Sequence, residues 1–156
     1  MSNFYAKICL NGHALVERHP LNSDEYCETC GAKMISKCPD CNNPIKEWDY
    51  SGVAVLGTPD FERPLYCKSC GKPYPWTKSA IEATALMIQE DNELSELERK
   101  SLEDSLPDII AETPKTKVAS IRVKKALLSA GKFTAEAIRE FVIDFGCELA
   151  KKSIGL

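Results

Sequence analysis

Four short cysteine motifs near the start of the chain limit what it can fold into. Three are C-x-x-C pairs, and the fourth, Cys9-Leu-Asn-Gly-His13, is a C-x-x-x-H pair. A C-x-x-C turn places two thiolates on one side of a tight loop, where they can occupy adjacent vertices of a tetrahedron about 2.3 Å from zinc. Pairing the motifs in chain order predicts two sites with four ligands each. Site one (residues 9–30) uses Cys9, His13, Cys27 and Cys30, and site two (residues 38–70) uses Cys38, Cys41, Cys67 and Cys70.

The sequence leaves two features of these sites undecided: the histidine ligand and the metal. His19 could replace His13 as ligand, but His13 is preferred because Gly12 beside it suits a knuckle, whereas His19 precedes Pro20 in a predicted loop. Iron could occupy the four-cysteine site two, as in a rubredoxin-type centre, although zinc is the usual metal of such ribbons. Because both ligand sets are complete, we expect both metals to be structural, with no open position for substrate.

Size and composition exclude several classes of protein. The chain has 156 residues, of which 44% are hydrophobic and 28% charged, so it is too apolar for a disordered protein and too charged for a membrane-embedded one. Its N-terminus lacks the apolar core and cleavage site of a signal peptide. We therefore expect a cytoplasmic protein, in which thiols stay reduced and cysteines serve as metal ligands.

The composition changes sharply in the middle of the chain. Seven of the nine prolines and five of the eight glycines precede Thr77, whereas Ala, Leu, Ile, Glu and Lys dominate after it. Dense turn residues between cysteine pairs indicate short strands and knuckles. We predict a small α+β fold with tandem zinc ribbons over residues 1–76 and a four-helix region over 77–156. The long insert of site two carries three aromatic residues that could form a small core or a contact patch: Trp48, Tyr50 and Phe61.

Capping signals place the four predicted helices. The first begins at Thr77 and runs to about Glu90, and the second begins at the capping box Ser95-Glu-Leu-Glu98 and ends before Pro107. The third runs from Thr113-Pro114 to Gly131. The last begins near Phe133 and carries an apolar stripe that could close a bundle or mediate self-association: Ile138, Phe141, Val142, Phe145 and Leu149, with Cys147 at its edge as a small hydrophobe.

Charge is distributed unevenly along the helical half. Residues 82–112 contain ten acidic and two basic side chains, whereas residues 113–132 contain six basic and no acidic ones. These segments could be solvated faces of neighbouring helices, or the basic helix could contact nucleic acid or an acidic partner. The candidate contact residues are Lys115, Lys117, Arg122, Lys124 and Lys125.

Several motifs along the chain carry a resemblance to a known family. They are Ile8-Cys-Leu-Asn-Gly-His13, Cys30-Gly-Ala-Lys33, Cys70-Gly-Lys-Pro-Tyr-Pro-Trp-Thr77, and Leu106-Pro-Asp with Thr113-Pro114. The chain resembles, over nearly its whole length, a family of small bacterial proteins of unknown function with N-terminal zinc ribbons and a helical C-terminus. The resemblance implies the same eight metal ligands in a double ribbon and supplies no activity.

These observations favour a non-enzymatic, zinc-binding interaction module or adaptor of the bacterial cytoplasm, with two zinc ions per chain and another protein as partner. No catalytic triad, paired-carboxylate site or phosphate-binding loop is present in the helical half of the sequence. The first 76 residues hold eight basic and nine acidic side chains. Two zinc–thiolate sites would bring their net charge to about −4, which disfavours phosphate binding there. The alternatives are a nucleic-acid-binding ribbon protein that uses the basic helix 113–132, and an iron-binding redox carrier at site two.

Overall fold

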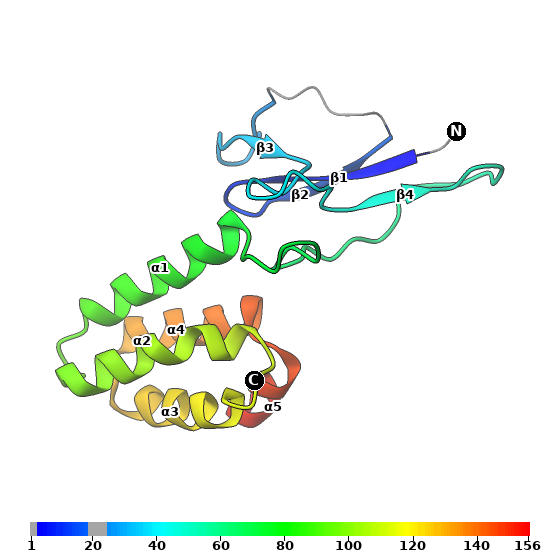
Figure 1. Cartoon of the computed structure of the whole chain (residues 1–156). Coiled ribbons are helices and arrows are strands. Elements are labelled where there is room, and N and C mark those ends of the chain that lie inside the picture. The colour runs from blue at the N-terminus through cyan, green and yellow to red at the C-terminus, as the bar shows by residue number, and fades with distance from the viewer. Residues whose placement is uncertain (1–2, 19–24) are drawn as a thin grey trace. The chain divides into compact units, whose positions relative to one another are not determined.

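The structure is a computed structural model that describes residues 3–18 and 25–156 (Figure 1). Its contacts divide the chain into two compact units, Met1–Ser79 and Ala80–Leu156. Short antiparallel strands and two cysteine clusters belong to the first unit, and most of the helical structure belongs to the second. The predicted small α+β fold with tandem ribbon knuckles is therefore confirmed.

The first unit is built around one central strand. Strand β1 (Asn3–Cys9) pairs antiparallel with β2 (Ala14–Glu17), with β3 (Met34–Ile35) at its C-terminal end and with β4 (Glu47–Asp49) at its N-terminal end. Phe4, Ala6 and Ile8 of β1 are fully buried. The core of this unit combines apolar side chains with two cysteines of site two: Ile8, Ile45, Tyr74 and Trp76 with Cys38 and Cys67. The metal-ligand segments therefore lie in the core itself.

Five helices follow the ribbons. They are α1 (Pro75–Gln89), α2 (Glu96–Ile110), α3 (Thr116–Ser129), α4 (Lys132–Phe145) and α5 (Glu148–Ile154). Helices α2 to α5 bury a common set of apolar side chains. The largest fully buried ones are Leu102, Leu106, Ile109, Val123, Ile138 and Val142. The second unit thus has a hydrophobic core of its own.

The prediction of a single last helix was wrong, because Gly146 divides it. The amide of Gly146 still donates to the Val142 carbonyl at 2.8 Å, but its backbone is extended (φ −65°, ψ 142°). A Cβ atom at this position would lie 2.4 Å from the Val142 oxygen, so only glycine fits. The next amide, of Cys147, donates to the Ile109 carbonyl at 2.9 Å, and α5 begins after it.

Proline did not end α2, contrary to the prediction. Pro107 lies inside the helix and removes one of its backbone hydrogen bonds, a change that costs about 3 kcal/mol in an isolated helix. Leu106, Ile109 and Ile110 are all buried around it. Burial of these three side chains, at about 2 kcal/mol each, outweighs the cost of the proline and extends the helix by one turn.

Two helix starts also differ from the predictions. Helix α1 begins at Pro75, two residues before Thr77, because a proline needs no partner for its nitrogen in the first turn. The Thr77 hydroxyl donates to the Leu65 carbonyl at 2.7 Å instead of capping the helix. Helix α3 begins at Thr116, because Thr113 belongs to a preceding turn in which its hydroxyl donates to Asp108 Oδ1 at 3.0 Å.

Candidate metal centres

The three C-x-x-C motifs share one backbone frame. Isolated bridges close the base of each knuckle between the residues just outside it, at Tyr26–Lys33, Lys37–Pro44 and Tyr66–Pro73. In each knuckle the amide of the residue after the second cysteine donates to the carbonyl of the first cysteine, at 2.7 to 2.9 Å. That residue adopts a positive φ in all three, and it is Gly31 (71°), Asn42 (60°) or Gly71 (74°). The repeated turn places both sulfurs of each pair on one side of the loop.

Asn42 fills the glycine position of the second knuckle, which the sequence analysis did not identify. Asparagine is one of the few residues other than glycine that tolerate this left-handed backbone region. The following side chain, Asn43, donates from Nδ2 to the Cys41 sulfur at 3.4 Å. The Cys-Pro-Asp-Cys-Asn-Asn sequence is thus a knuckle of the same kind as its two Cys-x-x-Cys-Gly neighbours.

The structure brings Cys9, His13, Cys27 and Cys30 together at site one, with ligand atoms within 4.8 Å of one another. The Cys9 sulfur lies 3.7 Å from the Cys30 sulfur and 3.4 Å from His13 Nδ1. The distance from the Cys27 sulfur to His13 Nδ1 is 3.5 Å. A tetrahedron with zinc–sulfur bonds of about 2.3 Å and zinc–nitrogen bonds of about 2.0–2.1 Å has S–S edges of about 3.8 Å and S–N edges of about 3.5 Å. Site one therefore has the dimensions of a tetrahedral centre with three cysteine ligands and one histidine ligand, bound through Nδ1 of His13.

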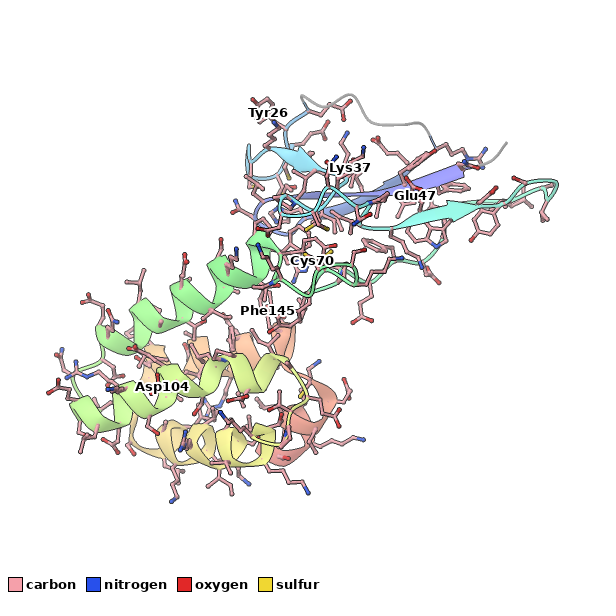
Figure 2. The ribbon with its side chains drawn as sticks, viewed as in Figure 1. Tyr26, Lys37, Glu47, Cys70, Asp104 and Phe145 are labelled. Atoms are coloured by element: carbon pink, nitrogen blue, oxygen red, sulfur yellow. The ribbon has the colours of Figure 1, made fainter. Side chains whose placement is uncertain are left out.

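Site two has the same dimensions with four sulfurs. Cys38, Cys41, Cys67 and Cys70 form the second cluster, again within 4.8 Å. The Cys38–Cys70 and Cys41–Cys67 sulfur distances are 3.8 and 3.7 Å, which match the edge of a zinc tetrathiolate. The labelled Cys70 lies beside the sulfur cluster in Figure 2. Both clusters could bind a metal ion.

The pKa values of the thiols show why a cation suits these clusters. The backbone amide of Ala32 lowers the pKa of Cys30 to about 6, and those of Cys70 and Ser69 lower the pKa of Cys67 to about 6. The amide of Lys72 lowers the pKa of Cys70, but burial and three neighbouring thiols raise it to about 11. Backbone dipoles thus favour some thiolates, whereas four negative charges this close repel one another. A divalent cation removes that repulsion and releases the remaining protons when it binds.

Side chains that contact the ligand segments stabilise the knuckles of site two. Tyr74 is buried, stacks on Trp76 at 4.6 Å, and hydrogen-bonds through its hydroxyl to the Cys67 sulfur. Burial, this hydrogen bond and the adjacent thiolates raise the pKa of Tyr74, so its hydroxyl stays a donor. Lys72 and Asp40 form an ion pair at 3.1 Å that joins the two knuckles. Such outer contacts fix the orientation of metal ligands.

Site one is held by two cationic side chains that the sequence analysis did not single out. Lys7 of β1 is 2% exposed and pairs with Glu25, which precedes the Cys27–Cys30 knuckle, and with Glu17 at 3.6 Å. Arg63 donates from Nη1 to the Gly12 carbonyl at 2.8 Å, and a Cβ on Gly12 would lie 2.3 Å from that nitrogen. Gly12 also has a φ of 94°. The positive φ, and the Trp76 Cβ that would lie 3.0 Å from an added Cβ, favour glycine beside His13.

The other predicted site residues are placed as follows. His19 lies outside the described residues, and Cys147 is half-buried before α5, far along the chain from either cluster. The aromatic insert residues pack against one another and against β1, with Trp48 edge-on to Phe61 at 5.5 Å and Tyr50 edge-on to Phe4 at 5.8 Å. Trp48 and Phe61 also line a pocket of about 380 Å³. The five candidate contact residues of the basic helix are exposed on α3 or at its N-cap: Lys115, Lys117, Arg122, Lys124 and Lys125.

The comparisons with known proteins identify a family but no activity. Residues 3–154 match the family described as uncharacterized protein conserved in bacteria (DUF2321). No curated protein and no solved structure matches the chain. Over residues 3–18 and 25–156, no helix combines the length and the hydropathy that a bilayer crossing requires.

Proposed function

We propose that this chain, which belongs to that bacterial family, is a non-enzymatic protein-interaction module whose first unit is folded by two structural zinc ions. One observation carries the proposal: each cluster has four protein donors at the edge lengths of a filled tetrahedron. A catalytic zinc keeps one position for water or substrate, whereas a structural zinc has four protein ligands. The metals then serve to hold a surface in place.

The donor sets support zinc as the metal. Tetrahedra of four cysteines, or of three cysteines and one histidine, are common structural zinc sites, and thiolates with one imidazole suit this ion. Elemental analysis of the purified chain should find about two zinc equivalents and no visible absorption band. A coloured protein with one iron equivalent would favour the alternative of a rubredoxin-like redox carrier at site two.

The insert of site two supplies the surface that we assign to a protein partner. It leaves the knuckle at Asn42 and returns at Tyr66, a span that holds the aromatic pocket. In this insert Leu56 is 100% exposed and Val53 is 62% exposed. Aromatic side chains are enriched at protein contacts, and the insert presents the Trp48–Phe61 pair in this pocket, with Val53 and Leu56 adding exposed apolar area to the same segment.

A capture experiment tests this assignment. The tagged wild-type chain is used as bait in lysate of its own cells beside two double variants, Val53→Ser/Leu56→Ser and the control Leu86→Ser/Ile143→Ser. The control removes two exposed apolar side chains (62% and 52% exposed) from the helical unit. We expect the wild type and the control to retain the same protein and the insert variant to lose it. Equal capture by all three baits would contradict the role of the insert.

Binding of duplex DNA or RNA is the competing function, and it can be measured directly. Fluorescence anisotropy at low and moderate salt should show only weak association, because the acidic helix α2 packs beside the basic helix α3 and the first unit carries a net negative charge with its metals. Tight binding with a steep salt dependence, lost in Lys124→Glu/Lys125→Glu, would establish nucleic-acid binding instead.

A further inference from the structure

Two neighbouring helices of the second unit carry opposite charge on their shared surface. Helices α2 and α3 pack side by side in antiparallel directions, so that Leu97 and Glu98 at the start of α2 lie level with Lys125 and Ala126 near the end of α3. Between them runs an open groove of about 300 Å³. Both edges of this groove lie on one face of the second unit.

The edge formed by α3 is basic. Arg122 and Lys125 line the groove, and residues at helical spacing before them extend the same stripe: Lys115, at the N-cap, and Val118. All four side chains are exposed, and Val118 is 50% exposed. The stripe therefore presents three positive charges and one apolar side chain.

The edge formed by α2 is apolar at one end and acidic along the rest. Leu97, which is 81% exposed, lines the groove. Asp104, labelled in Figure 2, follows Leu97 by one heptad and so lies on the same side of α2. Asp108 continues this stripe, and Glu98 lines the groove beside Leu97. The charges of this edge complement those of α3.

These opposite charges do not neutralise each other within the chain. Across residues 25–156, no ion pair joins an acidic side chain of segment 82–112 to a basic side chain of segment 113–132. The one described ion pair of the second unit joins Lys151 to Glu148. Glu98 accepts hydrogen bonds from Ser95, and Asp108 accepts one from the Thr113 hydroxyl, but no cationic side chain of the described residues neutralises either carboxylate. The charges of both edges can therefore still attract opposite charges of another molecule.

We propose that the α2–α3 face binds the same face of a second copy of this chain. A twofold axis that runs along the groove places α2 of each copy opposite α3 of the other, so that acidic edges meet basic edges on both sides. A twofold axis across the groove would instead place like charges opposite one another. The charge pattern therefore selects both the partner and the axis.

The size of the face sets the strength of this dimer. A helix of 15 residues is about 22 Å long, and two helices about 8–10 Å apart present a face about 20 Å wide. Two such faces bury on the order of 1,000 Å² in total, near the lower limit for a specific interface. The dimer is therefore reversible, and its dissociation constant should lie in the micromolar range at low salt.

The test uses two complementary charge reversals in the full-length, metal-loaded chain. Arg122→Glu/Lys125→Glu makes the α3 edge acidic, and Ser101→Lys/Asp104→Lys makes the α2 edge basic. Sedimentation equilibrium should give twice the 17.3 kDa chain mass for the wild type at high concentration and low salt. Each variant alone should dimerise at least tenfold more weakly. An equimolar mixture of the two should regain the dimer, because every edge then again meets its opposite.

Control measurements keep the outcomes separate. The control Arg139→Glu/Lys152→Glu makes the same change of net charge as the α3 variant, at two exposed positions of α4 and α5, and should dimerise like the wild type. Circular dichroism should confirm that every variant is folded. A wild type that is monomeric at all concentrations, or variants that fail to associate when mixed, would overturn the proposal. Dimerisation is measured in the absence of the protein that the insert is proposed to bind. A chain that does not dimerise therefore leaves the proposed function intact, and a chain that captures no partner protein leaves the dimer intact.

Discussion

Asp91 joins the turn before α2 to the start of α4, and its replacement by alanine should strongly destabilise the second unit. The residue is 5% exposed. Its Oδ1 accepts hydrogen bonds from the amides of Glu93 and Leu94 at 2.8 and 2.9 Å, and its Oδ2 accepts one from the amide of Gly131 at 2.9 Å. One carboxylate thus satisfies three backbone donors from two segments that lie 40 residues apart in the chain.

The size of the effect follows from these contacts. A hydrogen bond to a charged group contributes about 1.5–3 kcal/mol, and a buried donor that loses its partner costs about 1–3 kcal/mol. Because Glu93 is exposed and Gly131 half-buried, water can replace part of the loss at these two amides, whereas Leu94 is buried. We expect Asp91→Ala to lower the free energy of unfolding by about 3 kcal/mol, which in a unit of this size lowers the melting temperature by about 12–24 °C.

Far-UV circular dichroism during heating measures this change. Asp144→Ala, which removes an exposed carboxylate from α4, is the matched control and should stay within about 0.5 kcal/mol of the wild type. If Asp91→Ala also stays within that range, the carboxylate does not hold these segments together.

The protonation of Asp91 gives a second readout. Burial raises the pKa of its carboxyl, but hydrogen bonds from Thr134 and from the amides of Leu94, Gly131 and Glu93 more than offset this and hold the pKa below its usual value. A lowered pKa stabilises the fold above the unfolded value of about 4, and this contribution is lost as the pH falls through the folded value. The wild type should therefore lose more stability on acidification than Asp91→Asn does. Equal pH dependence of the two proteins would contradict the assignment.

Two further substitutions test the first unit. Cys67→Ser should lower the bound metal by one equivalent in elemental analysis and leave most of the helical signal, because the second unit has its own core; loss of all helicity would show that the two units unfold together. Gly12→Ala should destabilise the metal-loaded first unit by about 1–3 kcal/mol, since its φ is 94° and the new methyl would crowd Trp76 Cβ at 3.0 Å and displace Arg63 from the Gly12 carbonyl. Gly52→Ala is the control for backbone strain alone, because Gly52 also has a positive φ (81°) but no atom within 4 Å of the added Cβ. Chemical denaturation should show a smaller loss of stability for this control. Equal losses of stability in the two variants would refute the steric argument.

The local spacing of ligands is what made the metal clusters readable in the sequence. Two cysteines separated by two residues face the same side of a turn whatever surrounds them, and Gly31 and Gly71 mark the positive φ that closes the knuckle. Asn42 takes the same conformation in the remaining pair, so the preference for glycine there is strong but not absolute. These features depend only on a few neighbouring residues. Helical periodicity and composition are local in the same way, so they also located the helical half in the sequence.

Helix boundaries were less predictable, because they depend on residues that are distant in sequence. Pro107 stays within α2 because the core buries the side chains around it, and α4 ends at Gly146 because the next amide finds its acceptor on Ile109. A capping or helix-breaking signal is worth about 1–3 kcal/mol, which tertiary burial can exceed. A rule based on neighbouring residues alone cannot weigh such a signal against tertiary burial.

By itself, then, the sequence determined the fold class, the grouping of seven cysteines and one histidine into two sets, and the opposite charges of two helical segments. Only the tertiary structure decided that the His13 ligand atom is Nδ1, that Lys7, Arg63 and Tyr74 stand behind the ligands, and that acidic and basic edges line one groove without pairing. The physical reason is the distance along the chain over which each interaction acts. Turn geometry and helix periodicity act over a few residues, whereas contacts between side chains far apart in the chain form only when the whole unit has packed.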